Sequence, residues 1–265
     1  MANLTISQLN KIGERLRNNI ESEADIQSLE EFRASFGEAY QEVFDYLSSI
    51  GLNPGGRESK TTQSIRAKLV REKTRLSKMQ DIAGCRVVVD DLKAQDRAVE
   101  SLKAKWSNAK VDDRRIKPSH GYRAVHVITE IAGRAVEIQV RTRLQHGWAT
   151  ATEKLADVLN PDIKYGGGQE VIKDILAKIS GVLARAETVE MQHSQIKDSV
   201  EIGKEELKRE FIKSSGQKNE LLAKQITEMS ALEEQLKQQE IVISGTREDL
   251  KSLLQDLCAK LIVLK

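Results

Sequence analysis

The stretch YRAVHVITEIAGRAVEIQVRT, residues 122–142, consists of two short apolar runs separated by Gly133. Two such runs on either side of a glycine are typical of a β-hairpin. In the second run apolar and polar residues alternate, and alternate side chains of a strand point to opposite faces of a sheet. We therefore predict a half-buried strand. Its apolar face carries Val136, Ile138 and Val140, and its polar face carries Glu137, Gln139 and Arg141.

The residues around this hairpin predict alternating helices and strands. AGCRVVVD (83–90) indicates another strand, and a helical stretch to about Trp106 follows it. GLNPGGR (51–57) marks a loop, and a short helix is expected from about Thr62, whose hydroxyl can cap it. A further helix is expected from about Thr142 to Leu159. The central part, 51–160, is therefore predicted to be an α+β core with a mixed sheet flanked by helices.

Helical segments are predicted on both sides of this core. Residues 1–50 show helical periodicity in two amphipathic segments, with a second apolar series at Leu29, Phe32, Phe36, Tyr40, Val43 and Leu47. Residues 161–265 form a C-terminal helical extension, in which Gly245 is expected to interrupt a helix. An unbroken heptad series predicts helical hairpins or a short coiled coil. The series is Leu222, Met229, Leu236, Ile243, Leu250, Leu257 and Leu264.

Composition narrows the class of protein. The 265 residues contain no apolar run near the roughly 20 residues that a membrane helix needs, so we expect a soluble, cytoplasmic protein without a membrane partner. The two cysteines, Cys85 and Cys258, are far apart and indicate neither a disulfide framework nor a zinc site. The net charge is +2, yet residues 57–78 contain eight Lys or Arg and two Glu. This concentration of positive charge favours a phosphate-binding site, although a solvated helix face has the same composition.

Two carboxylates are predicted to lie on neighbouring strands. Asp81 precedes the strand at 83–90, and Glu137 lies in the second strand of the hairpin. Two such groups can bind one Mg²⁺ and leave coordination positions for water and phosphate oxygens. With the cation-rich window nearby, this pattern predicts transfer of a phosphoryl or pyrophosphoryl group.

The chain from about Arg57 to Leu155 resembles the synthetase domain of the RelA/SpoT family, and especially its small synthetases. The matching stretches are GRESKTTQSIRAKL, MQDIAGCRVVV, KPSHGYRAVHV, VEIQVRT and LQHGWATATEKLAD. The resemblance implies a nucleotidyltransferase-like mixed sheet and an Mg²⁺-dependent alarmone synthetase. Such an enzyme transfers pyrophosphate from ATP to the 3′ hydroxyl of GTP or GDP, which gives (p)ppGpp.

The resemblance also implies roles for individual residues. Asp81 corresponds to the Mg²⁺ ligand, and Glu137 to the carboxylate that shares the metal and helps to deprotonate the 3′ hydroxyl. The positions that match the ATP site are Arg57, Lys60, Ser64, Lys68, Arg71 and Arg86. Tyr122 corresponds to the residue that stacks on the acceptor guanine. The other positions that match the acceptor site are Lys117, His126, Gln139, Arg141 and His146.

The sequence departs from the family pattern at two places. The family commonly has one residue fewer between the lysine and the tyrosine, where Ser119 and His120 both intervene here. Lys60 also follows Arg57 by three residues, where some relatives have two. The first departure lies in the segment expected to contact the acceptor.

Two other functions are consistent with the sequence. Some toxic relatives pyrophosphorylate the 3′ end of tRNA, and Arg114, Arg115 and Arg123 are candidates for such contacts. A non-enzymatic nucleotide-sensing module is the second alternative, although it would not need the two carboxylates. No histidine precedes His120, so we expect no hydrolase activity. The C-terminal helices are expected to assemble a homo-oligomer or to bind a partner protein.

Overall fold

The computed structural model describes residues 4–214 and 217–263, with the backbone alone at 217–219, 257–258 and 260–263. The chain forms two compact units. The first extends to Asp90 and also contains Ala94–Lys117 and Arg123–Thr142, and the second contains Asp91–Lys93, Pro118–Tyr122 and the chain from Arg143 onward. The expected domains 1–50, 51–160 and 161–265 stay a proposal, because the compact units follow other boundaries.

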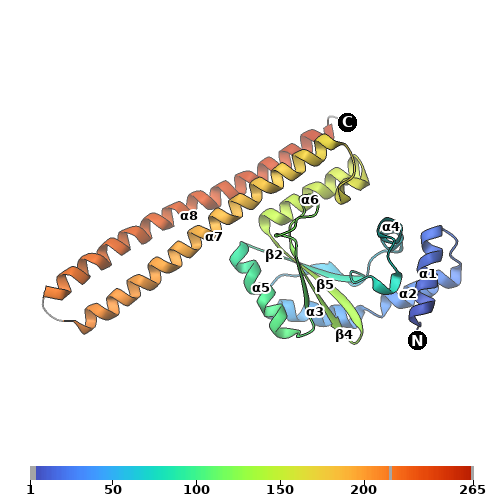
Figure 1. Cartoon of the computed structure of the whole chain (residues 1–265), viewed down its shortest axis with the longest axis horizontal. Coiled ribbons are helices and arrows are strands. Elements are labelled where there is room, and N and C mark those ends of the chain that lie inside the picture. The colour runs from blue at the N-terminus through green and yellow to red at the C-terminus, as the bar shows by residue number, and fades with distance from the viewer. Residues whose placement is uncertain (1–3, 215–216, 264–265) are drawn as a thin grey trace. The chain divides into compact units, whose positions relative to one another are not determined.

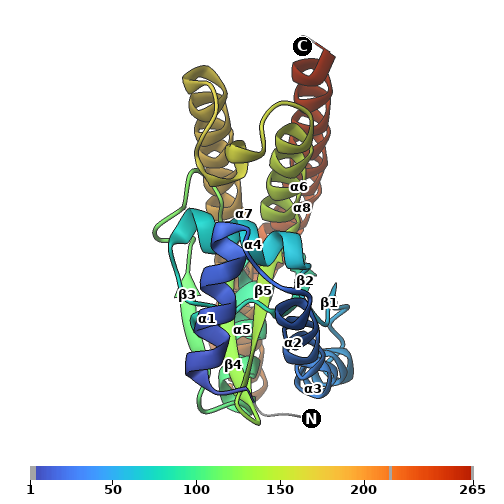
Figure 2. The ribbon, with the colours of Figure 1, turned by 90° about the vertical axis from the view of Figure 1, so that its right-hand side faces the viewer.

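A five-stranded mixed sheet forms the centre of the first unit. Its strands are β1 (Gly55–Arg57), β2 (Ala83–Val89), β3 (Lys110–Asp113), β4 (Val125–Ile131) and β5 (Arg134–Thr142). Their order in the sheet is β1-β2-β5-β4-β3, so that β3 and β1 are its edges (Figure 2). The β2–β5 pair is parallel and the other pairs are antiparallel.

Helices surround this sheet. They are α1 (Ile6–Asn18), α2 (Glu23–Ala34), α3 (Gly37–Ser49), α4 (Thr62–Glu72), the short 3₁₀ helix η1 (Leu76–Lys78) and α5 (Leu92–Lys105). The apolar residues of β5 are buried in one core with residues of α3 and α5. Tyr46 of α3 joins the two helices, since its ring lies 5.0 Å from that of Trp106 and its hydroxyl donates to the carbonyl of Ser101. The predicted α+β fold is therefore confirmed (Figure 1).

The hairpin between β4 and β5 is confirmed. Ala132 and Gly133 connect the strands, and both have positive φ, 48° and 76°. Two-residue turns of this kind match the right-handed twist of the flanking strands. The alternation in β5 is also confirmed, because Val136, Ile138 and Val140 are fully buried while Glu137 and Gln139 retain partial exposure.

Two expectations for the N-terminal half are wrong. The second predicted helix is broken into α2 and α3 at Ser35, whose hydroxyl donates to the Phe32 carbonyl and so competes with helix continuation. Apolar spacing continues across the break and conceals it. The N-cap of α4 is Thr61 rather than Thr62, because the Thr61 hydroxyl accepts from the backbone N–H of Ser64.

The expected loop at 51–57 contains the edge strand β1, and β3 was not predicted. Gly56 pairs with Cys85 of β2, and a Cβ at Gly56 would lie 2.3 Å from the carbonyl oxygen of Gly84. The glycine tract therefore permits a close approach between two backbones. Neither edge strand has an apolar alternation, because most of its residues are exposed.

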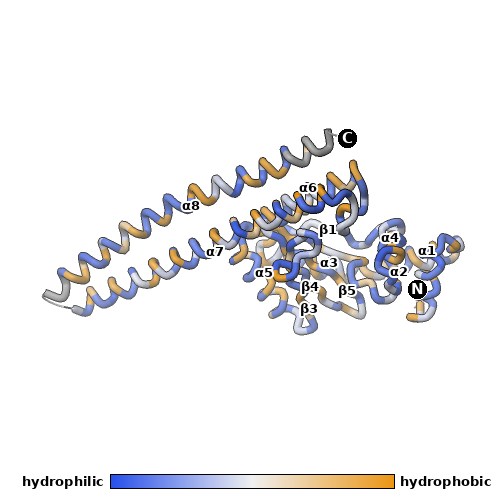
Figure 3. Tube along the Cα trace, turned by 45° about the horizontal axis from the view of Figure 1, so that its top comes forward, coloured by the Kyte–Doolittle hydropathy of each residue, from blue (hydrophilic) through white to orange (hydrophobic). Residues whose placement is uncertain are grey.

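The second unit is helical. Its elements are α6 (Arg143–Val158), the 3₁₀ helix η2 (Pro161–Tyr165), α7 (Glu170–Lys213) and α8 (Gln217–Val263). The two long helices are antiparallel, as the ion pairs Glu190–Arg247, Lys197–Glu240 and Lys204–Glu233 demonstrate. Figure 3 shows hydrophobic segments recurring along both helices between hydrophilic ones. No described helix combines the length and the hydrophobicity that a membrane span requires.

The predicted helical hairpin is present, but the interruption expected at Gly245 is wrong. The helix α8 continues through this residue, where a Cβ would meet no atom within 4 Å. A glycine in a helix interior costs roughly 1 kcal/mol relative to alanine. Contacts with α7 offset this cost, among them the two hydrogen bonds that Arg247 donates to Glu190. Leu222 and Leu236 of the heptad series are buried, and Leu264 lies outside the described residues. Assembly through these helices stays a prediction.

The close approach at Gly56 predicts a position-specific loss of stability. We expect Gly56→Ala to lower the free energy of unfolding by about 1–3 kcal/mol, because the new methyl group would collide with the backbone of β2. Gly55→Ala is the matched control, since it lies in the same strand and its Cβ would meet nothing within 4 Å. Urea unfolding of both variants measures the difference. Equal unfolding free energies for the two variants would contradict the expectation.

Candidate active site

The parallel pairing of β2 with β5 places the two predicted carboxylates near each other. Glu137 of β5 lies opposite Gly84 of β2, and Asp81 lies two residues before the first residue of β2, Ala83. Gly84 follows Asp81 by three residues, so the register brings the two carboxylates to the same end of β2. The structure therefore brings together the two residues expected to share a metal.

Two lysines neutralise Asp81. Lys60 Nζ lies 2.6 Å from one carboxylate oxygen and Lys68 Nζ lies 2.9 Å from the other. Burial raises the pKa of Asp81, but the two ammonium groups outweigh burial and hold the pKa below its ordinary value. Lys60 follows β1, and Lys68 extends from α4, so two separate elements deliver positive charge to one carboxylate.

Glu137 is held by hydrogen-bonding side chains from the same sheet. Its Oε1 lies 2.9 Å from Nδ1 of the buried His126, and its Oε2 accepts a 2.7 Å hydrogen bond from Gln139. Gln139 in turn accepts from the guanidinium of Arg141 at 2.6 Å. Burial and the charge of Asp81 raise the pKa of Glu137, but the hydrogen bonds from His126 and Gln139 outweigh them and lower it overall. Glu137 is thus ionised at neutral pH and fixed in orientation.

Strand register places two arginines on the same face of the sheet as Glu137. Arg57 of β1 pairs with Gly84, and Arg86 of β2 pairs with Gln139 of β5. Paired residues on adjacent strands point to the same face, so this face carries both guanidinium groups beside Glu137. The expected place of both arginines in the ATP site is compatible with this arrangement.

Gly84 is a residue of this face that the sequence reasoning missed. It lies between Arg57 and Glu137 in the row of paired residues and has no side chain to cover the sheet there. A glycine inside a predicted strand often marks close approach by a ligand or another backbone, so the signal was present in AGCRVVV. Gly84 adds no side chain to this face, and a Cβ there would lie 3.1 Å from the carbonyl oxygen of Glu137.

The remaining residues expected at the ATP site lie on α4. Ser64 is in its first turn, where its hydroxyl accepts from Thr61 Oγ1 at 2.9 Å, and Arg71 pairs with Glu72 at 2.9 Å. Ser64 and Lys68 are four residues apart and therefore share a face of the helix. Because Lys68 contacts Asp81, this face of α4 is directed toward that carboxylate.

The residues expected at the acceptor site are divided between the two units. His126, Gln139 and Arg141 belong to the sheet of the first unit, and the exposed Lys117 ends one of its segments. Tyr122 and His146 belong to the second unit. Tyr122 packs there against the core around Trp148, with the ring centroids 6.5 Å apart. The acceptor roles of all these residues stay predictions.

The carboxylates fit a magnesium site that substrate helps to complete. Among the described residues, no group of three or more His, Cys, Asp or Glu side chains is placed to hold a metal ion. Asp81 and Glu137 provide hard oxygen donors, and Mg²⁺ is commonly bound through one or two carboxylates together with water and phosphate oxygens. The donor set is therefore suited to Mg²⁺ bound together with a polyphosphate.

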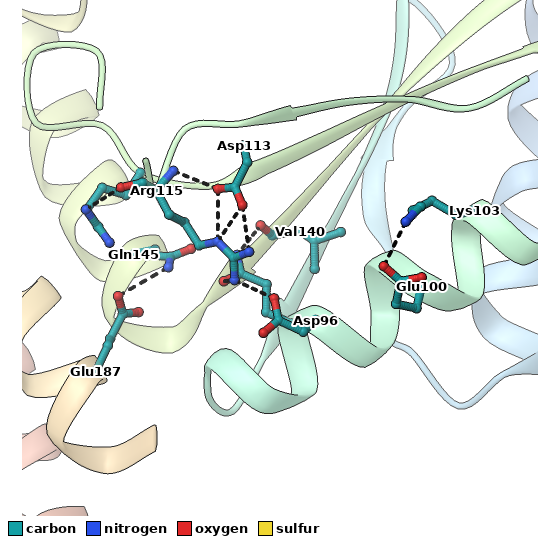
Figure 4. A network of polar contacts seen from close by, with 10 residues as sticks. Asp96, Glu100, Lys103, Asp113, Arg115, Val140, Gln145 and Glu187 are labelled. Atoms are coloured by element: carbon teal, nitrogen blue, oxygen red, sulfur yellow. Dashed lines mark hydrogen bonds and ion pairs between the residues drawn. The ribbon is translucent and has the colours of Figure 1, made fainter. Parts of the chain in front are cut away.

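The basic residues considered for tRNA are engaged within the first unit. The guanidinium of Arg115 donates to both carboxylate oxygens of Asp113, at 2.9 and 2.7 Å, and to Asp96 at 2.7 Å (Figure 4). Arg114 pairs with Asp112 at 2.8 Å, and Arg123 donates to the backbone carbonyl of Arg115 at 2.9 Å. These arginines stabilise the segment between β3 and β4.

The lowered pKa of Asp81 predicts a specific dependence of stability on pH. The contribution of ionised Asp81 to the free energy of unfolding is fully present above the ordinary aspartate pKa of about 3.9. It is lost as the pH falls through the lower pKa that Asp81 has in the folded protein. We therefore expect the unfolding free energy of Asp81→Asn to fall less than that of the wild type between about pH 6 and about pH 3. Urea titrations at each pH measure this, with the exposed Glu42→Gln as the control. Identical losses in the wild type and Asp81→Asn would refute it.

Comparison with known proteins agrees with this arrangement. Residues 56–156 match the model of the region found in RelA/SpoT proteins. An uncharacterised protein of Mycobacterium tuberculosis is 30% identical over an alignment of 189 residues, and the match covers 66% of this chain and 69% of the relative. The crystal structure of small alarmone synthetase 1 from Bacillus subtilis is 25% identical and has a TM-score of 0.51. The match covers 66% of this chain and 98% of that one.

The same Bacillus subtilis protein bound to its product pppGpp is also similar in fold. It has a TM-score of 0.53 at 24% identity and covers 65% of this chain and 98% of its own. The family model matches the segment that carries Asp81 and Glu137, and the mycobacterial relative is matched over more than two thirds of its length. This chain therefore belongs to the RelA/SpoT family.

Proposed function

We propose that the protein is an alarmone synthetase that transfers pyrophosphate from ATP to the 3′ hydroxyl of GTP or GDP, without hydrolase activity. The observation that carries the proposal is the pair of carboxylates at the β2–β5 junction, with Asp81 beside two lysines and Glu137 ionised beside His126. Membership of the RelA/SpoT family and the likeness to small alarmone synthetase 1 support it.

Glu137 is proposed to accept the proton of the attacking hydroxyl. The 3′ oxygen forms a bond with the β-phosphorus of ATP, the bond to the α-phosphate breaks, and AMP leaves. The hydrogen bonds from His126 and Gln139 aim the carboxylate and keep it ionised before the reaction. A positioned base of this kind commonly contributes about 10²- to 10⁴-fold to the rate.

Lys60 and Lys68 are proposed to exchange partners when ATP binds. Both neutralise Asp81 in the structure, and a polyphosphate gives them alternative anionic partners. Asp81 would then be available, together with Glu137, to hold Mg²⁺. The metal, when bound, neutralises the charge that develops on the phosphate oxygens.

Purine binding is assigned to planar groups on this chain. Arg57 and Arg86 share the sheet face with Glu137, and a guanidinium plane stacks well on a base. Tyr122 is proposed to stack on the acceptor guanine, with Lys117, Gln139, Arg141 and His146 as further acceptor contacts. A nucleotide is favoured over tRNA as the acceptor because Arg114, Arg115 and Arg123 already bind groups of the protein.

Transfer of label from ATP tests the proposal. The purified protein is incubated with γ-labelled ATP, Mg²⁺ and, in separate reactions, GDP, GTP, other nucleotides and deacylated tRNA. We expect label to appear in GDP or GTP, and Glu137→Gln to lower the rate by at least about 100-fold, because the variant has no base at the hydroxyl.

Glu130→Gln is the matched control, since Glu130 lies on β4 next to β5 and its side chain is exposed. It should retain wild-type rates. Label found in tRNA alone would replace the proposed acceptor. Transfer to no acceptor would favour a nucleotide-sensing module.

A further inference from the structure

Residues 119–122 form a tight turn at the end of the segment that carries Tyr122. Ser119 and Tyr122 exchange two backbone hydrogen bonds of 2.9 and 3.3 Å. The two residues between them, His120 and Gly121, have positive φ of 53° and 87°. This is the geometry of a two-residue hairpin turn, which fixes the direction in which the chain leaves it. The orientation of the Tyr122 backbone therefore depends on the turn.

The long helix α7 holds this turn from one side. The hydroxyl of Ser180, which is 5% exposed, donates a 2.6 Å hydrogen bond to the carbonyl of Gly121. A Cβ at Gly121 would lie 2.8 Å from Trp148 Cζ2 and 3.3 Å from Ser180 Cβ. Only glycine satisfies both the positive φ and the lack of space. The turn is thus packed against α6 and α7.

Further packing contacts hold the other residues of the turn in place. The ring of His120 lies against Gly166, where a Cβ would be 2.1 Å from His120 Nδ1. Trp148, whose ring neighbours Tyr122, donates its indole N–H to the carbonyl of Leu176 in α7 at 3.0 Å. The turn, Trp148 and α7 therefore form one connected packing arrangement within the second unit.

We propose that Ser180 is a positioning residue for Tyr122, so that helix α7 sets the affinity for the acceptor nucleotide. This inference rests on the proposed function, in which Tyr122 stacks on the acceptor base. Stacking needs the ring to be held in one orientation, because ordering it on binding costs conformational entropy. The helix α7 provides this order through the hydrogen bond from Ser180 to the Gly121 carbonyl and through its close packing against Gly121. The effect is specific to the acceptor, because every residue assigned to ATP lies in the first unit.

Kinetics of the full-length protein test the inference. In Ser180→Ala we expect the KM for the acceptor nucleotide to rise about three- to tenfold through loss of one hydrogen bond, with the KM for ATP unchanged. Ser180→Thr retains the hydroxyl and should restore the lower acceptor KM. Gly121→Ala should raise the acceptor KM further, because it adds backbone strain and a collision with Trp148.

Gly133→Ala is the matched control for backbone strain. Gly133 also has positive φ in a two-residue hairpin turn, but a Cβ there would meet nothing within 4 Å. It should leave both KM values unchanged. Unchanged acceptor KM in Ser180→Ala and Gly121→Ala would overturn the inference, as would an equal rise in both KM values.

Hydrogen exchange separates this inference from the proposed function. In Ser180→Ala the backbone amide of Tyr122, which donates to Ser119, should exchange faster than in the wild type. If the wild type transfers pyrophosphate to no acceptor, the proposed function fails. In that case faster exchange still supports the conclusion that α7 holds the turn at residues 119–122, whereas unchanged exchange rejects that conclusion.

Discussion

The parallel register between β2 and β5 is the constraint on which the candidate active site depends. Val136, Ile138 and Val140 are fully buried, so a slip by one residue would expose them and would turn Glu137 into the core. Burial of apolar residues on one face therefore determines which polar residues meet on the other. Glu137 comes opposite Gly84 because the core requires it, and this pairing places a residue without a side chain beside the carboxylate.

Charge balance explains why the site is stable before a nucleotide binds. A buried carboxylate is costly unless it is paired and hydrogen-bonded. Asp81 meets this requirement with two lysines, and Glu137 meets it with His126 and Gln139. The difference between the two carboxylates agrees with their proposed roles. Asp81 has cationic partners that a polyphosphate can attract, whereas Glu137 has partners from its own sheet that keep it in place.

Local patterns predicted the centre of the molecule and failed where contacts between distant residues decide the structure. Alternation in 134–142 was sufficient for β5 and for the face that Glu137 occupies. The strand β1 has no such pattern, because its pairing depends on Gly56 fitting against Gly84. For the same reason the ion pair between Lys60 and Asp81 was not predicted. The resemblance placed Lys60 in the ATP site and Asp81 at the metal, and it did not imply that the two side chains contact each other.

Two hairpin turns among the described residues show how one local geometry serves different purposes. Ala132–Gly133 and His120–Gly121 both have positive φ at both positions. Gly133 needs only conformational freedom, since the space around it is open, and the strands on either side provide the register. Gly121 has no sheet to hold it, because Ser119 and Tyr122 form only an isolated bridge. Its order must come from packing, and the residues that supply it, Trp148 and Ser180, belong to α6 and α7. A helical extension whose sequence suggests assembly or binding of a partner protein thus also bears on the residue proposed to recognise the acceptor.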